Sequence, residues 1–460
     1  MNALRPEVDV PKNGVRPPVV IIGAGFAGLS AATLLAEHGV RVLVLDARAR
    51  LGGRATAFED RETGELVDNG QHVMFGCYHE TLALLKRIGA DGNVQMQRTL
   101  EIPFIGRDGL RTELRCPPWL PAPLHLLGGV LGWRGLPMRD RLSALRLAPA
   151  LLSRARRTPP SGANTATVLE WLHSHGQSPG LITALWEPLA VAALNQPINQ
   201  AAAGPFVRVL REMFSADKTA ASLVLPTRPL HEMYADPART FIERHGGEVR
   251  TGALARVIAD DPGVTAVEVR GERIPTTQVI SAVPWHGLRT LFATPPPALA
   301  RTIADASAMA SMPIVTVNLW YDRVVMPDAF VGLTGRTVQW IFDKRRVFGE
   351  AASHLSLVVS AAEAITPLTR DELVAIAVRD VADALPGARS ATLIRATVVR
   401  EKQATFSLTP FQPARPLALT AVPGFVLAGD WTATDLPGTI ESAALSGHLA
   451  ARAILNSGYK

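Results

Sequence analysis

The first clear pattern in the chain is a short apolar run, then glycines, then a longer apolar segment. Residues 19–22 are Val-Val-Ile-Ile, residues 23–28 contain three glycines, and residues 29–36 are rich in alanine and leucine. A second apolar run, residues 42–45, ends in Asp46. Short apolar runs beside glycine are typical of buried strands, and the alanine-rich stretch is long enough for a helix. The pattern therefore predicts strand, turn, helix and strand.

Similar patterns recur far along the chain. We expect a hairpin in 100–116, helices in 165–217, strands in 248–251, 278–284, 313–321, 338–342, 355–360, 392–400 and 425–430, and a last helix in 442–455. The fold class is therefore α/β, with a discontinuous Rossmann-like domain and an inserted α+β domain. We assign 17–98, 224–288 and 420–457 to the first domain, and 99–223 and 289–419 to the second.

The three glycines lie in the spacing of a dinucleotide-binding fingerprint between strand and helix. Gly23 permits a tight turn, Gly25 lets the backbone approach a pyrophosphate, and Gly28 lets the helix pack closely on the strand. The start of the helix offers free N–H groups and a positive dipole to phosphate. Asp46 lies about twenty residues further on, where a carboxylate binds a ribose diol.

A membrane span is the alternative interpretation of this region. Residues 19–36 are nearly uncharged and are long enough to raise the possibility. The glycine spacing, the strand-like run before it and Asp46 beyond it favour the nucleotide-binding interpretation instead.

Three further segments carry residue types that suit a dinucleotide. Leu51-Gly52-Gly53-Arg54 combines close backbone approach with a guanidinium group that can bind pyrophosphate oxygens. Residues 67–72 place polar groups at the end of a short strand. Residues 427–431 precede the start of the last helix, whose dipole would stabilise an anionic reduced ring system.

Together these motifs resemble the FAD-dependent amine oxidase and phytoene desaturase superfamily, across nearly the whole chain. Asp68-Asn69-Gly70-Gln71-His72 with residues 75–78, Trp186-Glu187-Pro188-Leu189 with residues 193–197, and residues 429–437 narrow the resemblance to the hydroxysqualene dehydroxylase family. In the superfamily the Asp46 position is often Glu, but Asp can still reach a ribose diol. The residues that the resemblance implies for FAD binding are Gly23, Gly25, Phe26, Ala27, Gly28, Asp46, Arg48, Gly52, Gly53, Arg54, Gly70, Gln71, His72, Ala255, Gly429, Asp430, Thr439 and Ile440.

The resemblance implies reductive removal of the allylic hydroxyl of hydroxysqualene, giving squalene. In that reaction an acid protonates the hydroxyl, water leaves, and reduced flavin delivers hydride. The expected proton donors are Asp435 and His72. The alternative without catalysis is that Asp435 is an ordinary turn residue and that His72 is a hydrogen-bonded histidine at the end of a strand. Glu187 is a further candidate, and Glu441 is read as a helix-dipole partner. The rival functions are a carotenoid-type desaturase and a non-catalytic prenyl-lipid carrier.

The amino-acid composition limits the kinds of molecule that the protein is expected to bind. The 460 residues suggest two or three domains, with 47% hydrophobic and 19% charged residues. The net charge is +6 and the pI is near 9.7. No nucleic-acid-binding motif accompanies this charge, so an anionic membrane surface is the expected partner.

The membrane expectation centres on residues 117–157, which we expect to be helical. An apolar run, Leu124 to Trp133, comes before a group of arginines, although a solvated face would have the same composition. The arginines are Arg134, Arg139, Arg141, Arg146, Arg154, Arg156 and Arg157.

Two cysteines in unrelated contexts, Cys77 and Cys116, form neither a disulfide framework nor a metal-ligand pattern. A reducing compartment follows, so we expect a cytoplasmic protein that is peripheral on the inner face of the membrane. Only one full glycine fingerprint is present, so a second nucleotide site is not evident and the reductant is unidentified. The sequence leaves homo-oligomerisation open.

Overall fold

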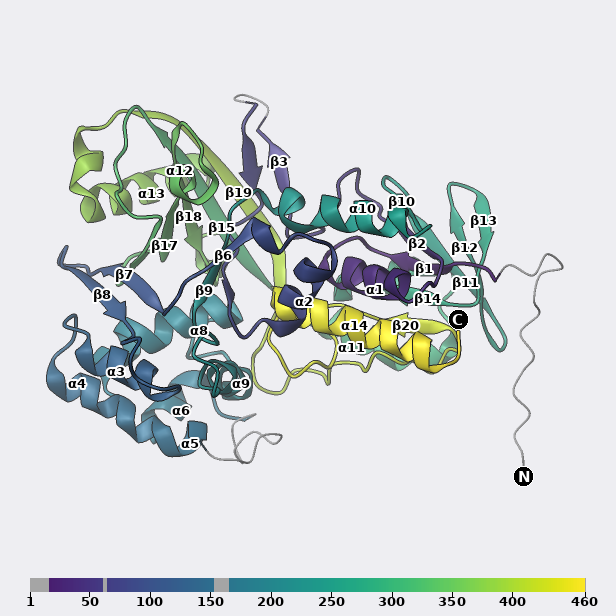
Figure 1. Ribbon diagram of the computed structural model, residues 1–460, viewed down its shortest axis with the longest axis horizontal. Coiled ribbons are helices and arrows are strands. Elements are labelled where there is room, and N and C mark those ends of the chain that lie inside the picture. Colours follow the sequence, from purple (N-terminus) through teal and green to yellow (C-terminus); the bar gives the residue numbers. More distant parts are fainter. Residues whose placement is uncertain (1–15, 61–63, 153–164, 460) are drawn as a thin grey trace.

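The structure is a computed structural model that describes residues 16–60, 64–152 and 165–459. One layer is a five-stranded sheet in the order β10-β2-β1-β14-β20, and every neighbouring pair in it is parallel (Figure 1). Its strands are β1 (Val19–Ile22), β2 (Val42–Leu45), β10 (Glu248–Arg250), β14 (Val279–Ser281) and β20 (Phe425–Leu427). The predicted α/β class and Rossmann-like sheet are confirmed.

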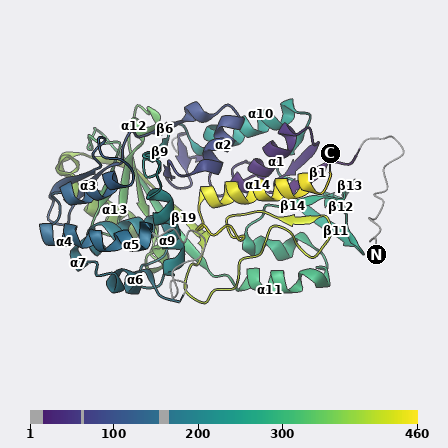
Figure 2. The ribbon, with the colours of Figure 1, turned by 60° about the horizontal axis from the view of Figure 1, so that its bottom comes forward.

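Two long helices, α1 (Phe26–Glu37) and α14 (Ile440–Asn456), lie side by side against this sheet (Figures 1 and 2). They approach closely because Gly447 has no side chain, and a Cβ there would lie 2.1 Å from the carbonyl oxygen of Ala27. Helices α2 (His79–Arg87) and α10 (Asp236–Arg244) pack beside them. The apolar run 19–36 is thus a strand and a buried helix, and none of the described helices is long and apolar enough to cross a membrane.

A second sheet has seven strands in the order β19-β15-β18-β17-β16-β7-β8. The predicted hairpin in 100–116 forms its β7–β8 edge, and β7 pairs in parallel with β16. Helix α13 (Arg370–Ala384) covers one face with Leu373, Ala377 and Val381. The strands are β7 (Glu101–Ile105), β8 (Arg111–Arg115), β15 (Ser311–Tyr321), β16 (Phe330–Leu333), β17 (Trp340–Asp343), β18 (Ser353–Val359) and β19 (Leu393–Phe406). The domain boundaries given above stay a prediction.

Helices gather at the end of the molecule away from the chain termini (Figure 2). They are α3 (Leu124–Gly132), α4 (Met138–Ser143), α5 (Ala148–Leu152), α6 (Val168–Ser174), α7 (Pro179–Leu181), α8 (Glu187–Leu194) and α9 (Ala203–Met213). Helix α6 begins with a capping box between Thr167 and Glu170. Of the arginines singled out above, Arg154, Arg156 and Arg157 lie outside the described residues.

Asn195 fastens these helices to the seven-stranded sheet. It ends α8 in the left-handed conformation, with φ +49°. Its Nδ2 donates to the carbonyl oxygen of Met312 at 3.2 Å and to Thr405 Oγ1 at 3.0 Å. Its Oδ1 accepts from the Ala361 N–H at 2.7 Å. Asparagine suits this place because it tolerates positive φ and offers both a donor and an acceptor.

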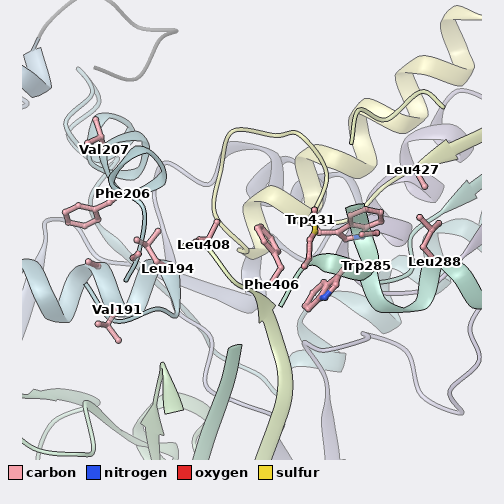
Figure 3. Packing of buried hydrophobic residues seen from close by; sticks show 14 of the residues in the cluster. Val191, Leu194, Phe206, Val207, Trp285, Leu288, Phe406, Leu408, Leu427 and Trp431 are labelled. Atoms are coloured by element: carbon pink, nitrogen blue, oxygen red, sulfur yellow. The ribbon is translucent and has the colours of Figure 1, made fainter. Parts of the chain in front are cut away.

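One hydrophobic core runs between the parallel sheet and the helices (Figure 3). Trp285, Trp431 and Phe406 occupy its middle, with Leu427 on the side of the parallel sheet and Phe206 among the helices. The remaining elements are β3 (Ala57–Glu59), β4 (Leu66–Asp68), β5 (Met74–Phe75), β6 (Val94–Met96), β9 (Leu223–Pro226), β11 (Ala255–Asp260), β12 (Gly263–Val269), β13 (Glu272–Pro275), α11 (Ala300–Ala308) and α12 (Lys344–Phe348).

Candidate functional site

Two of the fingerprint glycines are required by the protein itself. Gly23 has φ +108°, and a Cβ there would lie 2.7 Å from the carbonyl oxygen of Ala282 on the neighbouring strand. A Cβ on Gly28 would lie 1.8 Å from the carbonyl oxygen of Gly23. Neither position can hold a side chain, so the turn and the start of α1 stay pressed against the sheet.

Gly25 differs from both, because nothing in the protein excludes a side chain there. Its φ is −87°, and an added Cβ would meet only Gly52 O and Gly53 Cα, each at 3.8 Å. No side chain caps α1, so its first N–H groups, at Phe26 and Ala27, have no partner within the helix. Glycines 25, 52 and 53 thus line a cradle at a helix N-terminus, and a phosphate group fits that chemistry.

Asp46 holds this cradle in shape from the end of β2. Its Oδ2 accepts from the Ala24 N–H at 2.7 Å, and its Oδ1 accepts from the Arg48 N–H at 2.8 Å. Arg48 Nη1 in turn donates to the carbonyl oxygen of Gly53 at 3.0 Å. Ala255 begins β11 two residues after Ala253, whose N–H donates to the Asp46 carbonyl oxygen at 2.7 Å. The structure therefore brings together all the predicted residues of this edge.

Arg54 joins motifs from the two ends of the chain. Its Nη2 donates to Asp430 Oδ1 at 2.5 Å, and its Nη1 donates to the carbonyl oxygen of Ala404 at 2.8 Å. The guanidinium group lies over the ring of Trp285, 5.5 Å from the centroid. Gly429 has φ +140° beside Asp430, a conformation that glycine adopts readily. Asp430 is buried, so this pair is a fixed part of the site.

A buried lysine that the sequence analysis missed organises residues 68–72. Lys344 Nζ donates to Asp68 Oδ2 at 2.8 Å and to Gln71 Oε1 at 2.6 Å. The side chains of Lys344 and Asp68 are 1% and 2% exposed. A lysine is almost never this buried without a partner, so the pair fixes the position of the loop that carries Gly70 and Gln71.

His72 follows in the same loop. Its Nδ1 lies 2.8 Å from the Gly70 carbonyl oxygen, which can only accept, so Nδ1 carries the proton and Nε2 is an acceptor. Burial lowers the pKa of His72, so the imidazole is neutral at pH 7. A neutral imidazole hydrogen-bonds well but is a poor proton donor.

The second missed residue is Arg415, which organises the loop before α14. Its Nη1 donates to Leu436 O at 2.6 Å, and its Nη2 donates to Asp430 O and Thr434 Oγ1, each at 2.8 Å. Burial lowers the pKa of Arg415 to about 10, and the charges of Asp430 and Asp435 act in the opposite direction. The guanidinium group therefore stays charged at neutral pH.

The loop that Arg415 holds contains Asp435 and ends at the helix start. Asp435 has φ +61° and is exposed, as expected for an aspartate in a turn. Thr439 caps α14 by accepting from the Ser442 N–H at 3.2 Å, so Ile440 is the first helical residue. Glu441 accepts from the N–H groups at the start of α2 at 2.9 Å, so it is a helix-dipole partner, as expected, but of a neighbouring helix.

A pocket of about 180 Å³ lies beside this loop. Its lining includes Leu436 and Thr439 from the loop, Tyr78, Ala193 on α8 and Arg208 on α9. Burial raises the pKa of Tyr78, so its hydroxyl stays protonated at neutral pH. A larger pocket of about 450 Å³ beside α10 contains none of the predicted site residues. The smaller pocket is therefore the one that connects the helix start with the helical end of the molecule.

A glycine cradle at a helix N-terminus, the Asp46 carboxylate beside it and a second helix N-terminus on one parallel sheet are the arrangement expected of a dinucleotide-dependent oxidoreductase. The family model for flavin containing amine oxidoreductases matches residues 26–455, and the chain belongs to that family. The cofactor is therefore FAD, and the protein is a flavin-dependent oxidoreductase.

Comparison with individual proteins shows which members of the family are similar to this chain. The chain is 30% identical to a hydroxysqualene dehydroxylase of Sinorhizobium fredii over 453 residues, covering 96% of this chain and 98% of that protein. It is 28% identical to a hydroxysqualene dehydroxylase of Zymomonas mobilis, covering 94% of this chain and 97% of the other. It is also 26% identical to zeta-carotene desaturase of Arabidopsis thaliana, covering 99% and 88%. The predicted resemblance is confirmed.

Solved structures agree on the fold. An oxidoreductase from Methanosarcina mazei superposes with a TM-score of 0.72 at 16% identity, over 95% of this chain and 99% of that one. Putrescine oxidase bound to putrescine superposes with a TM-score of 0.69 at 19% identity, over 96% and 99%. At these identities the likeness concerns the fold alone.

We predict that Gly25→Val abolishes FAD binding, because the branched side chain fills the cradle, and that Gly25→Ala weakens it less. FAD released into the supernatant on heating, per mole of protein, measures this. Gly92→Val is the matched control, since a Cβ at Gly92 meets nothing within 4 Å. Wild-type FAD content in Gly25→Val would contradict the assignment of the cradle.

We predict that Lys344→Met lowers the free energy of unfolding by about 3–5 kcal/mol, because it leaves the Asp68 carboxylate buried without its partner. Denaturant unfolding of the FAD-loaded protein measures this. The control is Arg301→Met, which removes an arginine with an 89% exposed side chain from its ion pair with Asp305 and should cost less than about 1 kcal/mol. Equal losses in the two variants would refute the prediction.

Proposed function

We propose that this protein removes the allylic hydroxyl of hydroxysqualene reductively and releases squalene, in hopanoid and squalene biosynthesis. The similarity to hydroxysqualene dehydroxylases over almost the whole chain is the observation that carries this proposal. The matched region covers 94–96% of the chain, so it includes the segments that line the pocket beside α14 and not only the nucleotide-binding motifs. The substrate class is therefore a long polyisoprenoid.

The geometry of the site supports the following assignment of the residues that would hold FAD. Glycines 25, 52 and 53, with the N–H groups of Phe26 and Ala27, take the pyrophosphate, and Asp46 takes the ribose diol. Arg54 and Asp430 lie between the cradle and the start of α14. We assign Gly70, Gln71 and His72 to the flavin ring, together with Thr439 and Ile440 at the start of α14.

The reaction breaks one C–O bond, forms one C–H bond and releases water. FAD, when bound and reduced, supplies the two electrons and the hydrogen. The protein must supply a proton to the hydroxyl, because hydroxide is a poor leaving group.

The donor stays between Asp435 and His72, with Glu187 as the reserve candidate. Asp435 is exposed in the structure, and burial lowers the pKa of His72. Exposure makes Asp435 a weak candidate for the acid, and a lowered pKa does the same for His72. Asp435 would need the substrate to shield it from water. Desolvation raises the pKa of Glu187, but Glu187 is exposed at the start of α8, so it too would need the substrate to shield it from water.

A carotenoid-type desaturase is the second candidate, and the similarity to zeta-carotene desaturase favours it. That reaction is an oxidation, in which no hydroxyl leaves and no acid is needed. The oxidation state in which the protein acts on its substrate therefore separates the two. A non-catalytic prenyl-lipid carrier would change neither substrate.

We predict that chemically reduced protein converts hydroxysqualene to squalene with one flavin oxidised per product, and that oxidised protein leaves phytoene unchanged. Gas chromatography and the flavin absorbance measure the two. Asp435→Asn and His72→Ala are each checked first for retained FAD, and one of them should lose at least about a hundredfold in rate. Full turnover in both variants would show that the proton donor is Glu187 or water. Desaturation of phytoene-type polyenes by oxidised protein would favour the desaturase function instead.

We also propose that the protein associates peripherally with anionic membranes through residues 117–157, of which the structure describes 117–152. Met138, Leu142 and Leu145 follow helical spacing and are 55%, 48% and 42% exposed, and Trp119 is 77% exposed. Large apolar side chains on a surface are typical of an interaction site. A bilayer that contains the polyisoprenoid is the partner that fits them.

Two arginines beside these side chains suit lipid phosphates. Arg134 and Arg139 are exposed and make no ion pair with any described residue. Arg141 and Arg146 donate instead to the carbonyl oxygens of Leu131 and Gly176, at 2.7 and 2.9 Å. Arg141 and Arg146 therefore have a structural role, and among the arginines that the structure describes in this segment the electrostatic attraction comes from Arg134 and Arg139.

We predict that the double variant Arg134→Glu and Arg139→Glu lowers binding to phosphatidylserine vesicles at least about tenfold, since each basic residue contributes about 1 kcal/mol near such a surface. Vesicle flotation at low and high salt measures this. The matched control reverses Arg256 and Arg273, two exposed arginines on the β11–β12–β13 sheet at the other end of the molecule (Figure 1). Equal binding by both double variants would refute the proposed surface.

A further inference from the structure

Helix α3 buries its one polar side chain together with apolar ones. Its residues are Leu-His-Leu-Leu-Gly-Gly-Val-Leu-Gly, and its buried side consists of His125, Leu126, Gly129 and Val130. The one polar side chain of the helix is thus 3% exposed, while Leu124 at its start is 48% exposed. A surface helix normally buries its leucines and exposes its histidine. The buried histidine therefore needs an explanation.

Both ring nitrogens of His125 are buried and have no hydrogen-bond partner among the described residues. The Lys218 backbone lies close enough to the His125 ring to favour its protonated form. It does not meet the geometry of a hydrogen bond to either ring nitrogen. Burying unpaired polar groups is costly, so native proteins rarely do it without a reason. Burial lowers the pKa of His125, which keeps the ring neutral. A neutral imidazole offers one donor and one acceptor, and an alcohol offers the same pair.

The surroundings of His125 lead towards the FAD site. The next residue on the buried side of α3, Leu126, belongs to an apolar cluster that also contains Cys77, Leu223 and Phe342. Phe75 and Tyr78 pack against the same cluster. Phe75, Cys77 and Tyr78 also line the pocket beside Leu436 and Thr439, at the start of α14. Apolar side chains thus continue from that pocket to the helix that presents Leu124 to the surface.

We infer that His125 is a binding site for the hydroxyl group of a polyisoprenoid alcohol, within an otherwise apolar path between the membrane-facing helices and the FAD site. This inference rests on the proposed function and deepens it, since it assigns a residue that distinguishes hydroxysqualene from hydrocarbons such as squalene or phytoene. His125 does not line the pocket beside α14, so it recognises the hydroxyl on the way to the FAD site and is not the acid of the reaction. Hydrogen-bonding sites discriminate strongly against analogues that lack the hydroxyl, because the buried groups are then left unpaired.

The test compares ligand affinities in oxidised, FAD-loaded protein, where no turnover occurs. Hydroxysqualene and squalene are titrated in the same detergent, and the change in flavin absorbance gives each Kd. We expect wild type to prefer hydroxysqualene, and His125→Leu to raise the Kd for hydroxysqualene about tenfold with little change for squalene. His125→Gln, which keeps a donor and an acceptor, should retain part of the preference. The control is His175→Leu, because His175 bonds to the carbonyl oxygen of Trp171 outside the cluster.

Each outcome decides the matter. If His125→Leu keeps the wild-type preference, the histidine holds only water and the inference is wrong. If both ligands weaken equally, the residue shapes the cavity without recognising the hydroxyl, and the inference is again wrong. Reduced wild-type protein is assayed in parallel for squalene formation. Turnover by wild type with an unaltered preference in His125→Leu overturns this inference alone, whereas no turnover by wild type overturns the proposed function and the inference with it.

Discussion

The parallel pairing of β1 with β14 is the contact on which the site depends. Ile22 lies opposite Ser281, the Ala282 N–H donates to the Ile22 carbonyl oxygen, and the absence of a side chain at Gly23 lets the two strand ends meet. Because β14 also pairs with β20, the loop that carries Asp430 ends beside the glycine turn. Residues separated by more than 370 positions thus become neighbours through two strand pairings. A Cβ at Gly23 would disturb both ends of the site at once.

Local pattern explains why so much of this could be predicted. The turn at Gly23 to Gly28 depends on backbone geometry that only certain residues allow, so its spacing is visible in the sequence. The four strands predicted between 313 and 400 from short apolar runs are all present, but β16 (Phe330–Leu333) was not predicted. The family resemblance supplied the cofactor, which the glycine fingerprint alone could not distinguish from another dinucleotide.

The residues that the sequence did not predict share a different property. Lys344, Arg415 and His125 each act through tertiary contacts with segments distant in sequence, or through the lack of such contacts. Lys344 follows a strand of the second sheet and contacts Asp68 about 280 positions earlier. A lysine or arginine in a polar stretch gives no sign of burial until its partner is placed. His125 was hidden for the opposite reason, since a single histidine in an apolar helix resembles ordinary core.

The shared hydrophobic core has a consequence for motion. Trp285, Trp431 and Phe406 fill the space between the parallel sheet and the helices, so the two halves of the molecule have no separate cores at this contact (Figure 3). Pulling the halves apart would expose large aromatic side chains to water, which disfavours a hinge at this place. Access to the buried cofactor must then come from small local rearrangements among the helices, at the end where leucines already face outward. This packing therefore makes the two halves one rigid unit and leaves conformational change to the helices at one end of the enzyme.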